Sequence, residues 1–314
     1  MSNFPEFPDF RRVHPEDKEL YESFYKKYDP YADLSFSNLL LWLDINDDLE
    51  ISSIGKEGIV LKYSNPYNFN KESYTLLAYR DCYSLIREIF EYQEARGLKK
   101  SLTMTPQVVV DNLRMTASLD KFDIAPEEDN KNYIFDTHRT TLLEGGEYKN
   151  LRRKINHFNN HYREDLTIEL LDLKVQKNSK LVMDSIEEWL GAPIITAGSA
   201  GNSLENEVIK RQILYQNVIP SECLAFYIKK RLQGFTIFHK LPQKDYVIAN
   251  HIKCNYHFQY MFDFIFFNLC RLCDTRGIKF INGEQDLGIL SLRAHKIQHK
   301  PFRFLNFYTI SSIS

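Results

Sequence analysis

The apolar and polar positions along the chain follow helical spacing in some stretches and strand spacing in others. In the first half, helical spacing predicts helices over 15–28, 35–42 and 83–95, with a fourth opened by Pro106. Short apolar runs bounded by turn residues predict strands over 49–54, 58–63, 74–79 and 102–105. This order of elements indicates a mixed α+β unit.

The second half has the same mixture. Helical spacing predicts helices over 147–162, 180–190, 204–218 and 258–275. Strands are expected over 133–135, 167–171, 223–228, 234–239, 246–251 and 304–310. The apolar stretch 278–281 follows the long helix and leads into a polar segment.

Two stretches, 95–114 and 275–293, resemble one another. Each ends a helix with Arg-Gly, enters a strand and finishes the following helix with Leu-Arg. This similarity predicts a divergent internal duplication of one α+β unit, although a chance match in so short a window is the alternative. The first copy lacks paired acids, so we expect any chemistry in the second copy or in a cleft between the two.

The segment 278–296 places two acids, Glu284 and Asp286, directly before three basic residues, Arg293, His295 and Lys296. Acids after a strand and bases on the next element form either a polar site or a structural ion-pair cluster. If Glu284 and Asp286 alternate along an extended segment, they share one face and one pocket. Desolvation beside a second carboxylate would then raise one pKa towards that of a useful base.

Composition narrows the class of protein. Of the 314 residues, 43% are hydrophobic and 14% aromatic, which suits a packed core, and a net charge of −2 excludes a strongly charged nucleic-acid binder. The five cysteines are odd in number and scattered, so a secreted disulfide framework is not expected. Cys270 and Cys273 form C-x-x-C inside an apolar helix pattern. Buried thiols are therefore expected there, and no metal site is predicted.

Neither end of the chain nor its interior shows a membrane signal. Residues 1–8 have no basic and apolar leader, and no apolar run reaches about 18 residues. A soluble, cytoplasmic protein is the expectation.

The motif Asn282-Gly-Glu-Gln-Asp-Leu-Gly288, followed by Leu292-Arg293, Lys296 and Pro301, resembles the family built on the C-terminal domain of bacterial phosphatidylglycerol lysyltransferase. Members often show N-x-E-x-D-x-G…L-R-x-x-K here. Other matching pieces are Tyr133…Leu142…Gly145, Lys154-Ile-Asn156…Phe158 and the strand ending in His251. Together they cover most of the chain from about residue 30.

The resemblance implies an α+β fold of two tandem GNAT-like (acyl-CoA N-acyltransferase-type) domains, each a mixed, mostly antiparallel sheet flanked by helices. We expect an N-terminal domain over 1–140 and a C-terminal domain over 141–314 that carries the site. It also implies a soluble acyl- or aminoacyltransferase that moves an aminoacyl group from charged tRNA to a lipid or amine acceptor. The alternatives are a non-catalytic binding or regulatory protein and an acetyl-CoA-type N-acyltransferase.

The candidate catalytic residues are Glu284, Asp286 and His251, because acyl transfer needs a base near the attacking acceptor. The candidate substrate-binding residues are Arg293, Lys296, Asn282, Lys154 and Asn156. The competing interpretation makes Asp286 a helix cap paired with Arg293, and His251 a structural histidine.

The sequence departs from the family at three places. Gly283 stands where an Arg is frequent, Gln298-His299 stands where Ser-Tyr is frequent, and Lys253 replaces the acid that usually follows the strand histidine. The lysyltransferases also carry a large membrane domain, which has no counterpart in this sequence. These departures leave the substrate open.

The donor is either aminoacyl-tRNA or acyl-CoA, and no cofactor is certain. A basic helix is the candidate tRNA contact, through Lys149, Arg152, Arg153 and Lys154, with His138-Arg139 nearby; a solvated face is the alternative. The loop 253–258, where acetyl-CoA enzymes of this fold carry a glycine-rich pyrophosphate cradle, has no glycine. The glycine-rich 197–202 is expected to be a flexible connection. This favours an aminoacyl donor.

Overall fold

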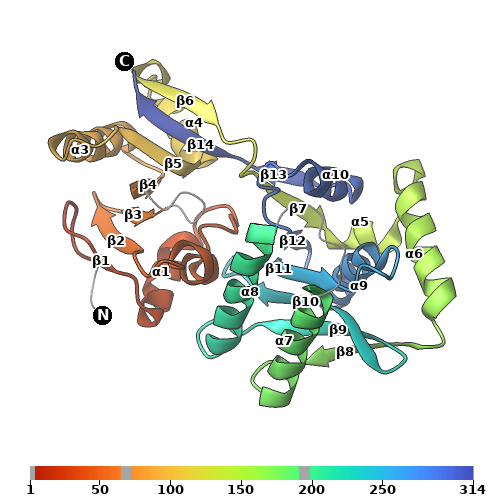
Figure 1. Cartoon of the computed structure of the whole chain (residues 1–314). Helices are drawn as coiled ribbons and strands as arrows, with labels where there is room; N and C mark the ends of the chain where they lie inside the picture. Colours follow the sequence, from red (N-terminus) through yellow and green to blue (C-terminus); the bar gives the residue numbers. More distant parts are fainter. Residues whose placement is uncertain (1–3, 65–71, 191–198, 314) are drawn as a thin grey trace. The chain divides into compact units, whose positions relative to one another are not determined.

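A computed structural model describes residues 4–64, 72–190 and 199–313. The chain forms two compact units, which are described separately. Unit 1 comprises residues 1–132, 285–290 and 304–314, and unit 2 comprises residues 133–284 and 291–303 (Figure 1).

Unit 1 holds a four-stranded antiparallel sheet and a three-stranded antiparallel sheet. The first has the order β1 (Arg11–Arg12), β2 (Glu50–Ile54), β3 (Gly58–Ser64), β4 (Glu72–Leu77). The second has the order β5 (Ser101–Pro106), β14 (Phe307–Ser312), β6 (Phe122–Pro126). Its α-helices are α1 (Lys18–Tyr25), α2 (Phe36–Asn38), α3 (Cys82–Ala95) and α4 (Gln107–Met115), and a π-helix spans Leu39–Leu43.

One hydrophobic core joins the two sheets of unit 1 to α3 and α4. Ile86, Ile89 and Phe90 project from α3 at helical spacing, and all three are buried with Leu102 of β5 and Ile310 of β14. The helical spacing that predicts this helix over 83–95 is therefore the spacing of its packed face.

Unit 2 contains a seven-stranded mixed sheet in which β11 and β12 pair in parallel. Its order is β13 (Arg303–Leu305), β7 (Asn132–Asp136), β12 (Phe280–Asn282), β11 (Tyr246–Cys254), β10 (Arg231–Lys240), β9 (Glu222–Ile228), β8 (Leu166–Leu171). Its helices are α5 (Thr137–Leu142), α6 (Lys149–Tyr162), α7 (Gln176–Leu190), α8 (Ser199–Leu214), α9 (Met261–Thr275) and α10 (Leu290–Gln298).

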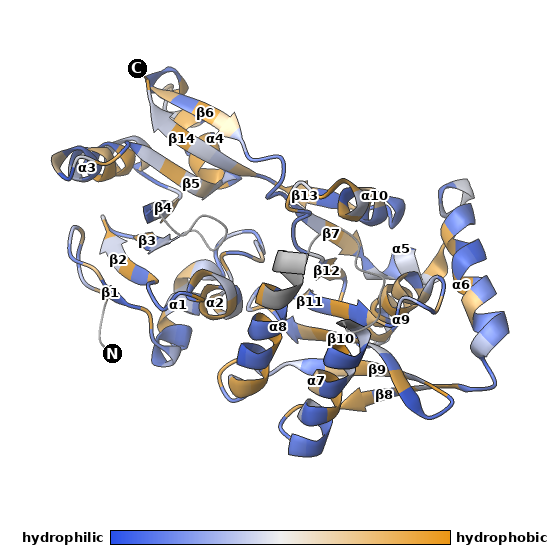
Figure 2. Ribbon diagram, in the orientation of Figure 1, coloured by the Kyte–Doolittle hydropathy of each residue, from blue (hydrophilic) through white to orange (hydrophobic). Residues whose placement is uncertain are grey.

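Strand alternation decides which helices cover each face of this sheet. Leu224 and Phe226 of β9 join the core formed with α6 and α9, whereas Cys223 and Ala225 join the core formed with α7 and α8. Both faces are thus covered, which explains why residues 223–226 of β9 and 232–239 of β10 are buried without interruption. Figure 2 shows the hydropathy of the residues along these strands.

Some strands pair with strands that are distant in the sequence. β14, which follows all the other strands in the sequence, pairs with β5 and β6 of unit 1. β7 pairs with β12 in the sheet of unit 2. The predicted division at 140/141 is eight residues from the boundary at 132/133. The predicted ranges also place the last strand with the second half, whereas its hydrogen-bonded neighbours belong to unit 1.

The two similar stretches occupy equivalent places in their units. α3 and α9 each end at an Arg-Gly pair, and Gly97 and Gly277 adopt left-handed φ values of +67° and +72°. Glycine is favoured there because a Cβ is strained in this conformation. A strand and a short helix then follow in both units, β5–α4 and β12–α10, as the duplication predicts.

Three local predictions need correction. β6 and α5 were not predicted, because their apolar runs are too short to show a period. Ser199–Asn202 belong to the first turn of α8 and not to a connection, while 197–198 lie outside the described residues. Finally, the segment after Asn282 is a loop, as described below.

All five cysteines are buried and free, as expected for apolar thiols. Burial raises the pKa of Cys273 to about 12, and the Cys270 thiol also has a raised pKa, so neither is a ready nucleophile. Within the described residues, no helix is both long enough and apolar enough to cross a membrane.

Candidate functional site

The family motif begins where β12 ends. Asn282 is fully buried, and its side-chain oxygen accepts a 2.7 Å hydrogen bond from the backbone N–H of Glu284. This turn places Glu284 at a φ of +60°, and Leu287 also takes a positive φ of +54°. The expectation that Glu284 and Asp286 alternate along an extended segment is therefore wrong.

Glu284 lies half-buried at the end of a chain of buried polar groups in unit 2. Its Oε1 accepts a long hydrogen bond, 3.4 Å, from the side-chain amide of Asn250. The Asn250 Oδ1 in turn lies 2.7 Å from His239 Nδ1 and accepts from Gln212 Nε2 at 3.2 Å. This network orients the carboxylate from one side and leaves part of it accessible, which suits a general base.

Asp286 is fully buried and holds the loop before α10 in unit 1. Its Oδ1 accepts a 2.9 Å hydrogen bond from the Gly288 N–H, and its backbone carbonyl accepts from Ile289. A Cβ on Gly288 would come within 2.9 Å of the Asp129 carboxylate, at a φ of +73°, so glycine is required there. These contacts make Asp286 part of the turn that precedes α10.

α10 carries Arg293 and Lys296 half-buried, on the helix where they were predicted. The Lys296 ammonium donates to the Gly283 carbonyl and lies 5.5 Å from the centre of the Tyr133 ring. A Cβ on Gly283 would lie 2.7 Å from Phe135 Cε2. The aromatic ring therefore occupies the space that the family's frequent arginine would need.

His251 has no solvent-exposed side-chain surface and shares the carboxylate of Glu205, from α8, with Lys253. The His251 Nδ1 is 3.2 Å from Glu205 Oε1, and the Lys253 ammonium is 2.5 Å from Oε2. Burial lowers the pKa of His251. Lys253 stands where the family usually has an acid, and Glu205 supplies an acid from a different element.

This cluster predicts a pH-dependent stability. Burial raises the pKa of Glu205, but the His251 hydrogen bond and the Lys253 charge outweigh it and bring the pKa to about 2. A depressed carboxyl pKa stabilises the fold above its unfolded value, near 4.5, and that stability is lost as the pH falls towards 2. We expect a loss on the order of 3 kcal/mol over this window. Denaturant unfolding of wild type and Glu205→Gln from pH 6 to pH 2 measures it; parallel curves would contradict the assignment.

Lys154, a predicted substrate-binding residue, is engaged within unit 2. Its ammonium is 3.1 Å from Asp263 Oδ2 of α9 and donates to Gln298 Oε1 of α10 at 2.7 Å. The same Asp263 carboxylate meets His299 Nε2 at 2.9 Å. Burial raises the pKa of Asp263, but the His299 hydrogen bond and the neighbouring charges bring it below its usual value. Asn156, two residues from Lys154, is exposed and does not join this group.

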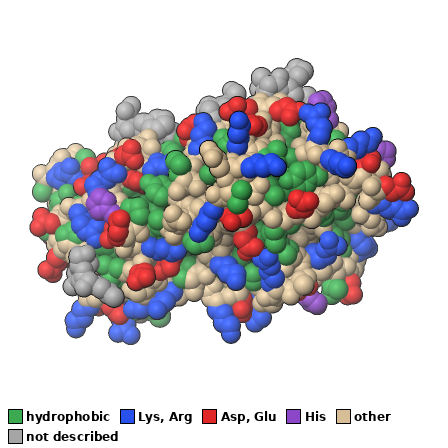
Figure 3. Space-filling view, turned by 90° about the horizontal axis from the view of Figure 1, so that it is seen from below, with side chains coloured by type: hydrophobic (Ala, Val, Ile, Leu, Met, Phe, Trp, Pro, Cys, Tyr) green, Lys and Arg blue, Asp and Glu red, His purple; other side chains and the backbone are tan. Residues whose placement is uncertain are grey.

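Two of the four basic side chains predicted to contact tRNA from α6 are engaged within unit 2. Arg152 donates to the backbone carbonyls of Leu143 and Gly145, so it and Lys154 are committed to contacts inside unit 2. Lys149 and Arg153 remain on its exposed surface. On the face shown in Figure 3, basic side chains are interspersed with acidic ones.

A cavity of about 540 Å³ lies within unit 1, and Gln285 and Leu287 of the motif form part of its wall. Four acids, Asp33, Glu127, Glu128 and Asp129, also line it, and no Lys or Arg occurs among the described lining residues, although Glu128 pairs with the neighbouring Lys131 at 2.8 Å. Trp42 and Tyr63 supply aromatic surface. An acidic, partly aromatic wall suits a cationic group such as an amine.

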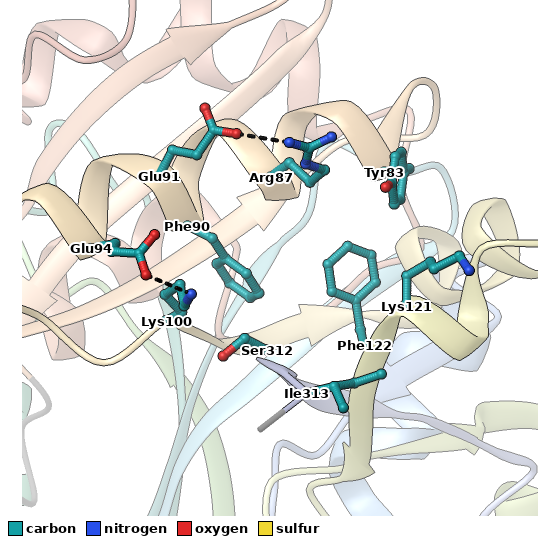
Figure 4. Close-up of a pocket in the computed structure, with 10 residues that line it drawn as sticks. All are labelled: Tyr83, Arg87, Phe90, Glu91, Glu94, Lys100, Lys121, Phe122, Ser312 and Ile313. Carbon is teal, nitrogen blue, oxygen red and sulfur yellow. Dashed lines mark hydrogen bonds and ion pairs between the residues drawn. The ribbon is translucent and has the colours of Figure 1, made fainter.

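A second cavity in unit 1, of about 350 Å³, differs in character (Figure 4). Four of its charged side chains form two ion pairs, Arg87–Glu91 and Lys100–Glu94, and the fifth, Lys121, pairs with Asp120. Phe90 and Phe122 supply its apolar surface.

The sequence profile of the phosphatidylglycerol lysyltransferase C-terminal family matches residues 25–310. The chain belongs to this family. No curated protein matches it significantly. Among solved structures, a conserved protein of unknown function from Bacteroides thetaiotaomicron is 19% identical and superposes with a TM-score of 0.81 over 97% of this chain and 99% of that one.

Two further structures are similar in fold. L-PGS from Bacillus licheniformis is 13% identical, with a TM-score of 0.59 over 99% of this chain and 94% of that one. A tandem GNAT protein from the clavulanic acid biosynthesis pathway is 9% identical, with a TM-score of 0.51 over 98% and 99%. The predicted tandem GNAT-like fold is thus confirmed, and family and fold identify an acyltransferase of the aminoacyl type.

Several residues of interest escaped prediction. Glu205, Asp263 and the four cavity acids come from elements far from the motif in sequence. The sequence held a weak signal for Glu205 and for Asp263. Lys253 stands where the family has an acid, so a counterion such as Glu205 was needed from elsewhere. Asp263 interrupts an otherwise apolar helix face, and a buried charge needs partners.

Proposed function

We propose that this chain transfers an aminoacyl group from a charged tRNA to a hydroxyl or amine acceptor. The observation that supports it most is the arrangement of the family motif in unit 2, where the half-buried Glu284 carboxylate is oriented by the side-chain amide of Asn250 and Lys296 donates to the Gly283 carbonyl. A partly accessible carboxylate can take a proton, and half-buried cations can bind the phosphate or ester oxygens of a donor.

Glu284 is the proposed general base, and Lys296 and Arg293 are the proposed contacts to the donor's phosphate or ester oxygens. Attack by the acceptor forms a bond to the aminoacyl carbonyl carbon while Glu284 takes the acceptor's proton. The bond from that carbon to the ribose oxygen then breaks, the ribose oxygen takes the proton from Glu284, and the uncharged tRNA is released. Cationic donors near the carbonyl oxygen stabilise the oxyanion formed between these steps.

Other predicted residues have narrower roles in this proposal. His251 is too deeply buried to meet the acceptor, so it positions Glu205 and Lys253 beside β11. The exposed Lys149 and Arg153 of α6 contact the tRNA backbone, and Asn282 sets the turn that aims Glu284.

Removing one cation of this group tests the proposal. Arg293→Met is expected to raise the KM for a charged tRNA about tenfold, since it removes a charge that binds the donor's phosphate or ester oxygens. Arg271→Met, on the exposed surface of α9 in the same unit, is the matched control and should leave the KM unchanged. Steady-state transfer kinetics measure both. An equal KM in the two variants would exclude Arg293 as a contact to the donor.

A further inference from the structure

Three potential metal ligands converge in unit 2. They are the Nε2 atoms of His295 and His299 and the Oδ1 atom of Asp263. His299 Nε2 lies 2.9 Å from Asp263 Oδ1 and 3.2 Å from His295 Nε2, and His295 Nε2 lies 3.7 Å from Asp263 Oδ1. The two histidines are four residues apart, His295 on α10 and His299 directly after its last residue, and Asp263 comes from the first turn of α9.

Hydrogen bonding alone accounts poorly for this triangle. The His299 Nε2 carries at most one proton, so it can donate to only one of its two neighbours, Asp263 Oδ1 and His295 Nε2. A single ion among the three atoms satisfies all of them together. With metal–ligand distances of about 2.1 Å, ligand atoms stand about 3.4 Å apart in a tetrahedral site and about 3.0 Å apart in an octahedral one. The three observed distances bracket these values.

We propose that His295, His299 and Asp263 bind one Zn²⁺ or a similar divalent transition-metal ion. Two imidazoles and a carboxylate favour this class of ion over Mg²⁺ and Ca²⁺, which prefer oxygen ligands alone. Asp263 and His299 are nearly inaccessible, whereas 25% of the His295 side chain is exposed. The ion is therefore reached from the side of His295, where a water or a substrate oxygen completes its coordination.

The surroundings hold the ligands in place. The edge-to-face contacts of His295 with Phe262 and of His299 with Phe266 fix both rings, with centroids 4.4 Å and 4.7 Å apart. Lys154 binds the other oxygen of Asp263, and Gln298 Nε2 donates to Oδ1 at 3.0 Å, so the carboxylate cannot rotate freely. Neighbouring groups of this kind are what keep a metal site preformed.

Metal binding by the full chain tests this proposal. Chelator-treated protein is titrated with Co²⁺, which reports its coordination by visible absorption, and with Zn²⁺, and bound metal is counted per chain. Wild type should bind one ion per chain, and Zn²⁺ should raise its Tm. No bound ion and no Tm shift in wild type would overturn the proposal without any variant.

A matched pair of variants locates the ion. His295→Gln should weaken binding at least tenfold, and Asp263→Asn should do so as well. His161→Gln is the control, because His157 and His161 form another pair four residues apart, on the exposed face of α6. Unchanged affinity in His295→Gln and Asp263→Asn, or a loss in His161→Gln alone, would contradict the assignment. Circular dichroism of the metal-free variants separates loss of ligand from loss of fold.

Discussion

Glu284→Gln is expected to reduce kcat/KM for the proposed aminoacyl transfer by a factor of about 10²–10⁴, the usual contribution of a positioned general base. The substitution keeps the size of the side chain and an oxygen to accept from Asn250, but removes the group that takes the acceptor's proton. Because proton transfer occurs in the transition state, we expect the loss in kcat and little change in the KM of the donor. Single-turnover and steady-state assays with charged tRNA separate the two.

The control for this variant is Glu164→Gln, which makes the same change at an exposed position of the same unit. It should retain wild-type kinetics. A Glu284→Gln enzyme within threefold of the control would show that the base lies elsewhere, and the next position to test would be the second acid of the motif, Asp286.

The second large effect concerns stability. Glu205→Gln is expected to lower the free energy of unfolding by about 3–5 kcal/mol at pH 7, because it leaves the Lys253 charge without its carboxylate in a mostly buried setting. The Lys253 side chain is 16% exposed, so water offers it little compensation. Chemical denaturation followed by circular dichroism measures the change.

Glu169→Gln serves as the control, since this acid lies exposed on β8 and should cost no more than about 0.5 kcal/mol. A similarly small loss for Glu205→Gln would contradict this account, because it would mean that water solvates the Lys253 ammonium well enough without the carboxylate. A double variant, Glu205→Gln with Lys253→Met, should recover part of the loss because it removes the stranded charge as well.

The regular elements were predictable from the sequence because their signals are local. Ile86, Ile89 and Phe90 mark the buried face of α3 by spacing alone, and Arg96-Gly97 and Arg276-Gly277 mark helix ends. The pairing of β14 with β5 and β6 was not predictable. The apolar period of residues 307–312 indicates that they form a strand, but it does not indicate which strand they pair with.

The candidate site was predictable in part. The motif identified the loop and α10, but not the different environments of its two acids. Glu284 is half-buried and oriented by the side-chain amide of Asn250, whereas the Asp286 carboxylate accepts a hydrogen bond from the Gly288 N–H within the turn. Glu205 contacts His251, and Asp263 contacts His299, only after folding, because more than 30 residues of sequence separate each pair. No sequence period encodes such pairings. The acidic cavity and the group of Asp263, His295 and His299 could therefore be identified only from the structure.

The most direct test of the proposed chemistry is an assay for the transferred group itself. The purified full chain is incubated with a mixture of charged tRNAs, or with acetyl-CoA, together with phospholipid and amine acceptors, and the products are identified by mass spectrometry. Aminoacylated product from the tRNA donors, absent with Glu284→Gln and absent with acetyl-CoA, is the predicted result. Acetylated product, or no aminoacylated product from any charged tRNA, would contradict it.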